Sequence, residues 1–264
     1  MINEPWFYVL AGTGFTFAMT ALGAALVFLF RRPPSPLLTK LSLGFAAGIM
    51  IAASVWSLLI PAINKAQELG QIPAIPAAGG FLLGAAFLLL IDHILPHLHI
   101  GSKSPEGPHS NLDKSTLLFL AVTIHNLPEG MAVGISFASA ALIGTPDALS
   151  AAFALALGIG IQNIPEGTAV SLPLHAAGLS RMKAFLMGSL SGLAEPIAAF
   201  IVVMLAGQFI SVLPWALSFS AGAMLYVVVE ELIPEAKLGE HSDLGTVAVL
   251  SGFVLMMILD TSLG

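Results

Sequence analysis

Hydrophobic residues fill most of the chain, and only short clusters of charged residues, prolines and glycines interrupt them. A helix needs about 20 consecutive, mostly apolar residues to cross the hydrocarbon core of a bilayer. Runs of this length occur eight times between the interruptions, so the pattern predicts eight membrane-spanning helices. The expected spans are residues 6–30, 41–63, 77–97, 116–140, 150–175, 184–207, 213–235 and 244–262.

Composition favours a membrane protein over a soluble one. Of the 264 residues, 57% are hydrophobic and 9% are charged, whereas soluble domains carry about 25% charged residues. The mean hydropathy is +0.94. We therefore expect an all-α integral membrane protein in which residues 1–264 form a single transmembrane domain within the lipid bilayer. The sequence pI near 5.5 gives no reason to expect a nucleic-acid partner.

Basic residues predict how the chain is oriented. Alternate loops of a multi-span protein lie on the same side of the membrane, and an excess of Lys and Arg marks the cytoplasmic side. Of the nine basic residues, only Lys65 falls on the other side. We therefore expect the loop 98–115 to be cytoplasmic and both termini to lie outside, in a bacterial inner membrane. The remaining eight are Arg31, Arg32, Lys40, Lys103, Lys114, Arg181, Lys183 and Lys237.

The sequence also repeats itself. The motif HNLPEG at 125–130 in the fourth span returns as QNIPEG at 162–167 in the fifth, and GFAAGIM at 44–50 in the second span returns as SFSAGAM at 218–224 in the seventh. The two spans of each pair differ by an odd number of crossings, so they run in opposite directions. Inverted repeats of this kind are typical of secondary transporters. A chance likeness between apolar helices is the alternative.

Ionisable side chains lie near the middle of three predicted spans. At a rise of 1.5 Å per residue, His125 and Glu129 lie about 14–20 Å from the inner end of their span. By the same count, Gln162 and Glu166 lie about 18–24 Å from an outer end, and Glu195 lies about 16 Å from an inner end. A charge inside a bilayer costs roughly 2.5–3.5 kcal/mol. Carboxylates at one depth therefore predict a cation that they share.

Each candidate ligand also has a structural alternative. The chain contains no cysteine, which excludes thiolate ligands and leaves imidazole, carboxylate, amide and thioether groups. A lone buried histidine such as His125 is often a structural group, and Glu195 could be a hydrogen-bonding residue between helices. Asn126 and Asn163 could likewise join helices by hydrogen bonds. Met50, at a similar depth, could be a thioether ligand or a packing residue.

A second polar group lies away from the middle of the membrane. Asp92 and His93 are expected in the inner half of the third span, and Glu230 and Glu231 in the inner half of the seventh. These side chains predict an exit route for the cation. The alternative is that they have no role in transport and simply extend to the membrane–water interface. Asp260 is expected in the outer half of the eighth span. At or beyond the inner ends lie His97, His99, His109 and Glu235.

At these residues the sequence resembles the ZIP family of metal transporters. HNLPEG, QNIPEG and SGLAEP match the family signature in spans four, five and six, and the likeness extends over nearly the whole chain. In the glutamine that begins its second motif, the sequence resembles the GufA-like bacterial branch of the family. The resemblance implies eight helices in a 3+2+3 inverted-repeat bundle, outward termini and a two-metal centre.

The family pattern implies specific ligands at matching positions. The first metal site would be formed by His125, Glu129, Gln162 and Glu166, with Met50 near the entry. The second would be formed by Asn126, Asn163 and Glu195, with Glu129 and Glu166 as bridges. The cytoplasmic exit would contain Asp92, Glu230 and Glu231, with Asp260 toward the outer side.

Three positions depart from that pattern. Related branches often have His where Gln162 stands, and close relatives have Asp where Asn163 stands. The second site therefore has one anion fewer, and by charge count it should bind a dication more weakly. Glu230 stands where relatives have His, which makes the exit more acidic.

The resulting hypothesis is uptake of Zn²⁺ into the cytoplasm by alternating access, with Cd²⁺, Fe²⁺ and Mn²⁺ as competitors. The family suggests an elevator-like movement, no enzymatic activity and no organic cofactor. One rival is an intramembrane metalloenzyme, but no H-E-x-x-H motif occurs. Another is an organic-cation transporter, which would need more aromatic residues than the 8% present. Small residues on several spans also permit a homodimer.

Overall fold

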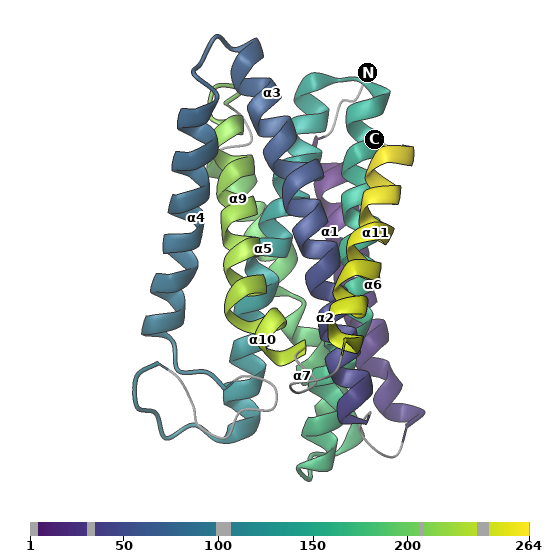
Figure 1. Ribbon diagram of the computed structural model, residues 1–264. Coiled ribbons are helices and arrows are strands. Elements are labelled where there is room, and N and C mark those ends of the chain that lie inside the picture. Colours follow the sequence, from purple (N-terminus) through teal and green to yellow (C-terminus); the bar gives the residue numbers. More distant parts are fainter. Residues whose placement is uncertain (1–4, 31–34, 99–106, 206–208, 237–242, 264) are drawn as a thin grey trace.

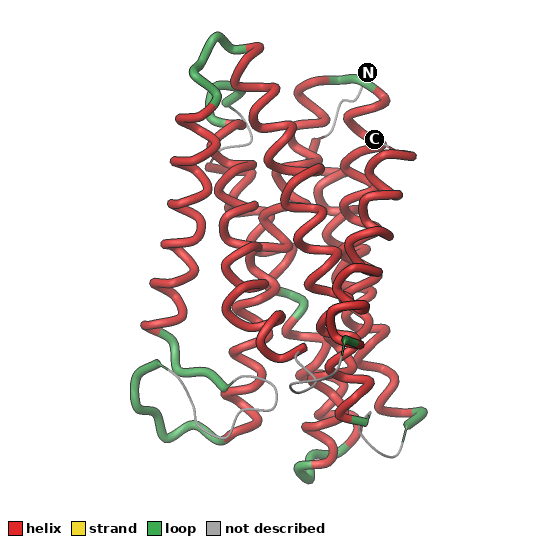
Figure 2. Tube along the Cα trace, viewed as in Figure 1, coloured by secondary structure: helices red, strands yellow, loops and turns green. Residues whose placement is uncertain are grey.

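A computed structural model describes residues 5–30, 35–98, 107–205, 209–236 and 243–263. Within these ranges the regular structure is almost wholly helical, and the helices stand side by side in one bundle (Figures 1 and 2). Eight of the helical runs are long and apolar enough to cross a membrane, which confirms the predicted number of spans. The start of the first run and the end of the last lie at the same end of the bundle, as an even number of crossings requires (Figure 1).

Four spans are single helices and four contain an interruption or a change of helix type. The single helices are α4 (Ala74–Ile94), α5 (Lys114–Ile143), α6 (Pro146–Ala176) and α11 (Leu244–Leu263). The first span is α1 (Pro5–Ala25) with the 3₁₀ turn η1 (Leu26–Phe28), and the sixth is α7 (Arg181–Ser191) with α8 (Ala194–Leu205). The second span consists of α2 (Pro36–Ala53), the π-helical η2 (Ser54–Leu59) and α3 (Ile60–Glu68). The seventh span is built in the same way from α9 (Leu213–Val227), the π-helical η3 (Val228–Leu232) and α10 (Ile233–Ala236).

Polar caps explain where several helices begin. The side chain of Ser35 accepts a hydrogen bond from the Leu38 amide at 3.2 Å, and Pro36 occupies the first helical position, which proline favours. The second helical run therefore starts five residues before the predicted span at 41–63. Asp113 caps α5, and the hydrogen bond from the Thr116 hydroxyl lowers the pKa of Asp113 below its ordinary value.

Glycines bring two pairs of helices into backbone contact. Where α2 packs on α11, a Cβ at Gly48 would lie 1.9 Å from the Val249 carbonyl oxygen, and one at Gly252 would lie 2.0 Å from the Phe45 oxygen. Only glycine allows so close an approach. The same arrangement joins α9 to α4, where the close contacts are Gly222 with the Phe81 oxygen and Gly84 with the Phe219 oxygen.

These two glycine contacts are copies of each other, as inverted repeats require. The motif match pairs the second span with the seventh, and the run FLLLID at 87–92 of the third span likewise matches VLMMILD at 254–260 of the eighth. The contact of α2 with α11 therefore corresponds to the contact of α9 with α4. The other two extensive contacts correspond in the same way: the contact of α1 with α6 in one repeat matches the contact of α8 with α5 in the other. Both π-helical segments precede an Ile-Pro pair, at Pro61 and at Pro234. Because proline lacks an N–H, the turn before it loses a hydrogen bond and widens in both copies.

Apolar side chains cover the outside of the bundle. On α4 the exposed residues include Leu82, Leu83 and Leu90, and on α11 they include Leu250 and Ile258. In water such a surface would be unstable, whereas in lipid it has no cost. The chain is therefore a multi-pass membrane protein.

Candidate functional site

The polar residues predicted near the middle of the membrane come together inside the bundle. They are supplied by α5, α6 and α8, and all of them are buried. The carboxyl groups of Glu129, Glu166 and Glu195 are close enough to interact electrostatically. The buried set is His125, Asn126, Glu129, Gln162, Asn163, Glu166 and Glu195.

A proline places Glu195 at the start of a half-helix. Pro196 has no N–H to donate to the Gly192 carbonyl, and the amide of Glu195 takes that carbonyl instead at 3.1 Å. The sixth span is therefore interrupted between α7 and α8, and Glu195 lies in the first turn of α8. A carboxylate is favourable there because the helix N-terminus carries partial positive charge.

Amide side chains hold one oxygen of each of two carboxylates. Gln162 Nε2 donates to Glu129 Oε1 at 2.7 Å, and Asn163 Nδ2 donates to Glu195 Oε1 at 2.9 Å. Each bond joins α6 to a neighbouring helix, α5 in the first case and α8 in the second. The two amides of the second PEG motif thus fix the orientation of the acids beside them.

Many oxygens of this cluster have no hydrogen-bond partner, although they are shielded from solvent. Leaving a buried polar group unpaired costs about 1–3 kcal/mol, and a concentration of such groups needs a reason. These atoms accept bonds but cannot donate them, which is the property of ligands for a cation. They are Asn126 Oδ1, Glu129 Oε2, Gln162 Oε1, Asn163 Oδ1, Glu166 Oε2 and Glu195 Oε2.

The acids are not gathered on a single point. Within the described ranges, no three His, Asp or Glu side chains are placed so that they could hold one metal ion by themselves. Amides separate them, and His125 is paired with Glu231 of the seventh span instead. A set of ligands that includes amide oxygens, or side chains that move toward a cation, is therefore needed for tight coordination.

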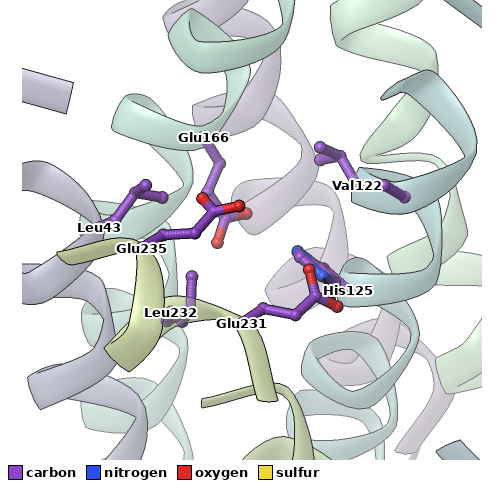
Figure 3. Close-up of a pocket in the computed structure, with 8 residues that line it drawn as sticks. Leu43, Val122, His125, Glu166, Glu231, Leu232 and Glu235 are labelled. Atoms are coloured by element: carbon purple, nitrogen blue, oxygen red, sulfur yellow. Dashed lines mark ion pairs between the residues drawn. The ribbon is translucent and has the colours of Figure 1, made fainter. Parts of the chain in front are cut away.

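A small cavity lies beside this cluster, between His125 and Glu166 on one side and the residues of η3 and α10 on the other (Figure 3). Its volume is about 10 Å³, which is room for about one water molecule. Figure 3 shows four ionisable side chains around it among apolar neighbours. They are His125, Glu166, Glu231 and Glu235.

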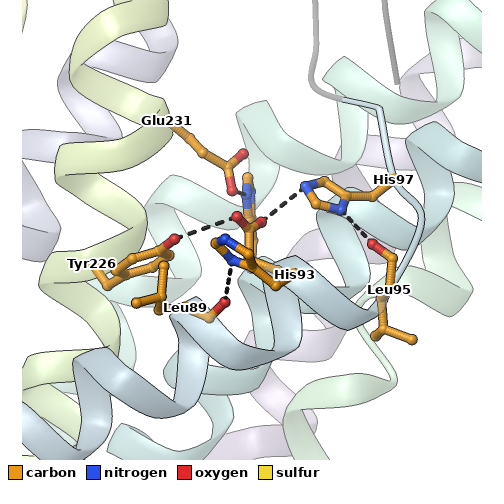
Figure 4. A network of polar contacts seen from close by, with 8 residues as sticks. Leu89, His93, Leu95, His97, Tyr226 and Glu231 are labelled. Carbon is orange, nitrogen blue, oxygen red and sulfur yellow. Dashed lines mark hydrogen bonds and ion pairs between the residues drawn. The ribbon is translucent and has the colours of Figure 1, made fainter. Parts of the chain in front are cut away.

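A second polar network lies at the C-terminal end of α4 (Figure 4). Asp92 Oδ1 is 2.9 Å from His97 Nε2, and Asp92 Oδ2 accepts from the Tyr226 hydroxyl at 3.3 Å. Asp92 and Glu231 are buried. His93 and Glu230 are exposed, and His93 Nδ1 contacts the Leu89 carbonyl oxygen at 2.8 Å.

The remaining candidates are dispersed. Asp260 has its own partner on the second span, because Ser57 donates to Asp260 Oδ1 at 2.6 Å, while Asp260 Oδ2 is buried without a partner. Met50 is fully buried in the hydrophobic core. His109 is exposed, and His99 lies outside the described residues.

Sequence reasoning missed one helix of the site. Thr16 and Thr20 of α1 are fully buried, and the Thr20 hydroxyl lies 3.2 Å from Glu195 Oε1. The spacing of Thr13, Thr16 and Thr20 on one face of the first span could have revealed it, since three hydroxyls on one helical face are unusual in so apolar a segment. Glu235, which the sequence places at the inner end of the seventh span with the candidate exit residues, lines the cavity.

Comparison with known proteins identifies the family. The family model described as ZIP Zinc transporter matches residues 99–260. The chain belongs to the ZIP family. Its ZIP relatives include the human zinc transporter ZIP11, which is 41% identical over 98% of both chains.

Two bacterial ZIP proteins place the chain beside the branch that its second motif suggested. The zinc transporter ZIPB of Bordetella bronchiseptica is 41% identical, covering 97% of this chain and 82% of that one. The zinc transporter GufA of Myxococcus xanthus is 39% identical over 97% of each. These names describe transporters, and none of them supports a metalloenzyme or an organic-cation transporter.

Proposed function

We propose that the chain carries Zn²⁺ across a bacterial inner membrane into the cytoplasm. The observation that carries the proposal is the group of buried, unpartnered oxygens on α5, α6 and α8. Three carboxylates at one depth repel each other in a medium of low dielectric constant, and a dication would remove that cost. The zinc transporters among its relatives support the choice of metal.

Each side chain of the cluster then has a role. His125, Glu129, Gln162 and Glu166 would bind the transported ion, since imidazole and carboxylate together suit Zn²⁺ and also admit Cd²⁺, Fe²⁺ and Mn²⁺. Asn126, Asn163 and Glu195 would form a second, weaker site with a single carboxylate of its own. Met50 would lie at the entry.

Release would follow the cavity. Glu231 is paired with His125. It would therefore compete with the ion for the imidazole of His125 and bind that imidazole once the ion has left. Glu235 and the buried Asp92 would supply carboxylates along the exit, and Glu230 and His93, which are exposed, would meet the ion at the interface. Asp260 would serve the outer side.

Zinc entry into vesicles tests this function. Purified protein is reconstituted into vesicles that enclose a zinc-sensitive dye, and protein-free vesicles provide the baseline. We expect external Zn²⁺ to enter far faster than the baseline, and Cd²⁺, but not tetraethylammonium, to compete. Entry no faster than in protein-free vesicles would refute the proposal.

Alternating access predicts that equivalent residues of the two repeats become accessible to water in turn, each from its own side of the membrane. Val122 lines the cavity, and the repeat equivalent of Val122 is the fully buried Ile159. The protein has no cysteine of its own, so Val122→Cys and Ile159→Cys give single reactive thiols. We expect a hydrophilic thiol reagent to label Val122→Cys from the inner side, and Ile159→Cys from the outer side during turnover. An Ile159→Cys thiol that never reacts during active transport argues against alternation.

A further inference from the structure

One face of α1 carries three buried hydroxyl groups. Thr13, Thr16 and Thr20 have no exposed surface, and their three- and four-residue spacing places them on the same side of the helix. Thr13 donates to the Val9 carbonyl at 2.8 Å, and Thr16 donates to the Thr13 carbonyl at 3.1 Å. These are ordinary bonds back to the preceding turn.

Thr20 makes a different contact. Its hydroxyl lies 3.3 Å from the Thr16 carbonyl oxygen and 3.2 Å from Glu195 Oε1, so one hydrogen is shared between the two acceptors. A bond to a carboxylate is stronger than one between neutral groups. Gly192 leaves the space for this side chain, because a Cβ there would lie 3.0 Å from the Thr20 hydroxyl oxygen.

The backbone of α1 also orients Asn163. Asn163 Nδ2 donates to the Thr16 carbonyl at 3.2 Å and to Glu195 Oε1 at 2.9 Å. Turning the amide over would place its oxygen against a carbonyl and a carboxylate, both of which only accept. The orientation is therefore fixed by α1, and it turns Asn163 Oδ1, which has no partner, away from both acceptors.

These contacts meet at a single atom. Thr20 and Asn163 both donate to Glu195 Oε1, while Glu195 Oε2 is buried without a partner. We propose that α1 is part of the cation site, and that Thr20 and the Thr16 carbonyl are positioning groups that direct Glu195 Oε2 and Asn163 Oδ1 at the ion. The inference rests on the proposed function and extends it to a helix that has no histidine, carboxylate or amide side chain.

The charge of the second site explains why such positioning matters. Glu195 is the one carboxylate that this site does not share with the first, and the site's other unshared ligands are amide oxygens. Such a site binds a dication more weakly, so each oxygen must already point at the ion. Ordering Glu195 before binding reduces the entropy that the ion would otherwise have to offset. Two neutral donors achieve this without adding a charge that would repel the cation.

Thr20→Val tests the inference, because valine has the shape of threonine without the hydroxyl. Initial rates of zinc entry are measured over a range of zinc concentrations in the same vesicles. We expect the KM of Thr20→Val to rise roughly tenfold, the size expected for losing a hydrogen bond to a charged group, with a smaller change in the maximum rate. Thr20→Ser keeps the hydroxyl and should restore the wild-type KM.

Thr13→Val is the matched control. Thr13 is equally buried on the same face but bonds only to its own helix, so its KM should stay at the wild-type value. If Thr20→Val does not fold, Thr20→Ala replaces it. A second readout is the zinc affinity of the detergent-purified protein, measured in competition with a chromophoric chelator. An unchanged KM in Thr20→Val or Thr20→Ala, or an equal rise in Thr13→Val, overturns the inference. If the wild-type protein still transports zinc normally, the proposed function stands.

Discussion

Replacing Glu129 with alanine should abolish zinc uptake into reconstituted vesicles. Glu129 is fully buried halfway along its span, interacts with Glu166 and Glu195, and accepts a hydrogen bond from Gln162. In the proposed centre it is, with Glu166, one of the two carboxylates common to both metal sites. Its loss removes charge that offsets the dehydration of the ion, so we expect uptake to fall to the level of protein-free vesicles.

Two further variants separate charge from folding. Glu129→Gln keeps the shape of the side chain and an oxygen to which Gln162 can donate. Uptake should still fall at least about tenfold, because removing one anion from a desolvated dication costs more than about 1.4 kcal/mol of binding free energy. Glu68→Ala removes an exposed carboxylate that pairs only with Lys65 and should transport normally. Wild-type uptake by Glu129→Ala contradicts the proposed site.

Valine at Gly252 should prevent the stable assembly of α11 on α2. Its Cβ would lie 2.0 Å from the Phe45 carbonyl oxygen, and a backbone atom cannot move aside as a side-chain tip can. Overpacking of a core usually costs about 1–3 kcal/mol, and here two whole helices must separate. We expect little folded protein after purification and a much lower melting temperature in detergent.

The repeat supplies a second copy of the same experiment. Gly84→Val meets the Phe219 oxygen on α9 and should be as harmful as Gly252→Val. Gly14→Val is the control, because nothing lies within 4 Å of a Cβ there. Comparable folding of Gly84→Val and Gly14→Val would show that the two repeats do not pack alike.

The sequence predicts the spans well because each depends only on local hydrophobicity. All eight are found, and most ends agree within a few residues. The second span was placed too short at both ends, because its helix continues from the Ser35 cap through the polar turn that ends at Glu68. Polar helix ends outside the hydrocarbon core leave no hydrophobic signal.

The site was predicted in its residues but not in its connections. Motif and depth identify His125, Glu129 and Glu195, since a buried charge needs a reason. They cannot say that His125 pairs with Glu231, because that depends on how two distant spans pack. The break before Glu195 could have been predicted from Pro196, whereas the widened turns η2 and η3 follow from proline only when the neighbouring helix is known.

The unequal side chains of the two repeats affect transport kinetics. Glu231 and Glu235 line the cavity beside α10, while the matching positions of the second span are Leu58 and Ala62, both without exposed surface. A cation moving inward can exchange one carboxylate for the next, whereas the corresponding outward path offers it hydrocarbon. A carrier cannot alter the equilibrium set by the gradient, so influx and efflux are equal when zinc is equal on both sides. The asymmetry would instead be seen when zinc is present on one side only, as a KM and a maximum rate that differ between the two directions while their ratio stays the same.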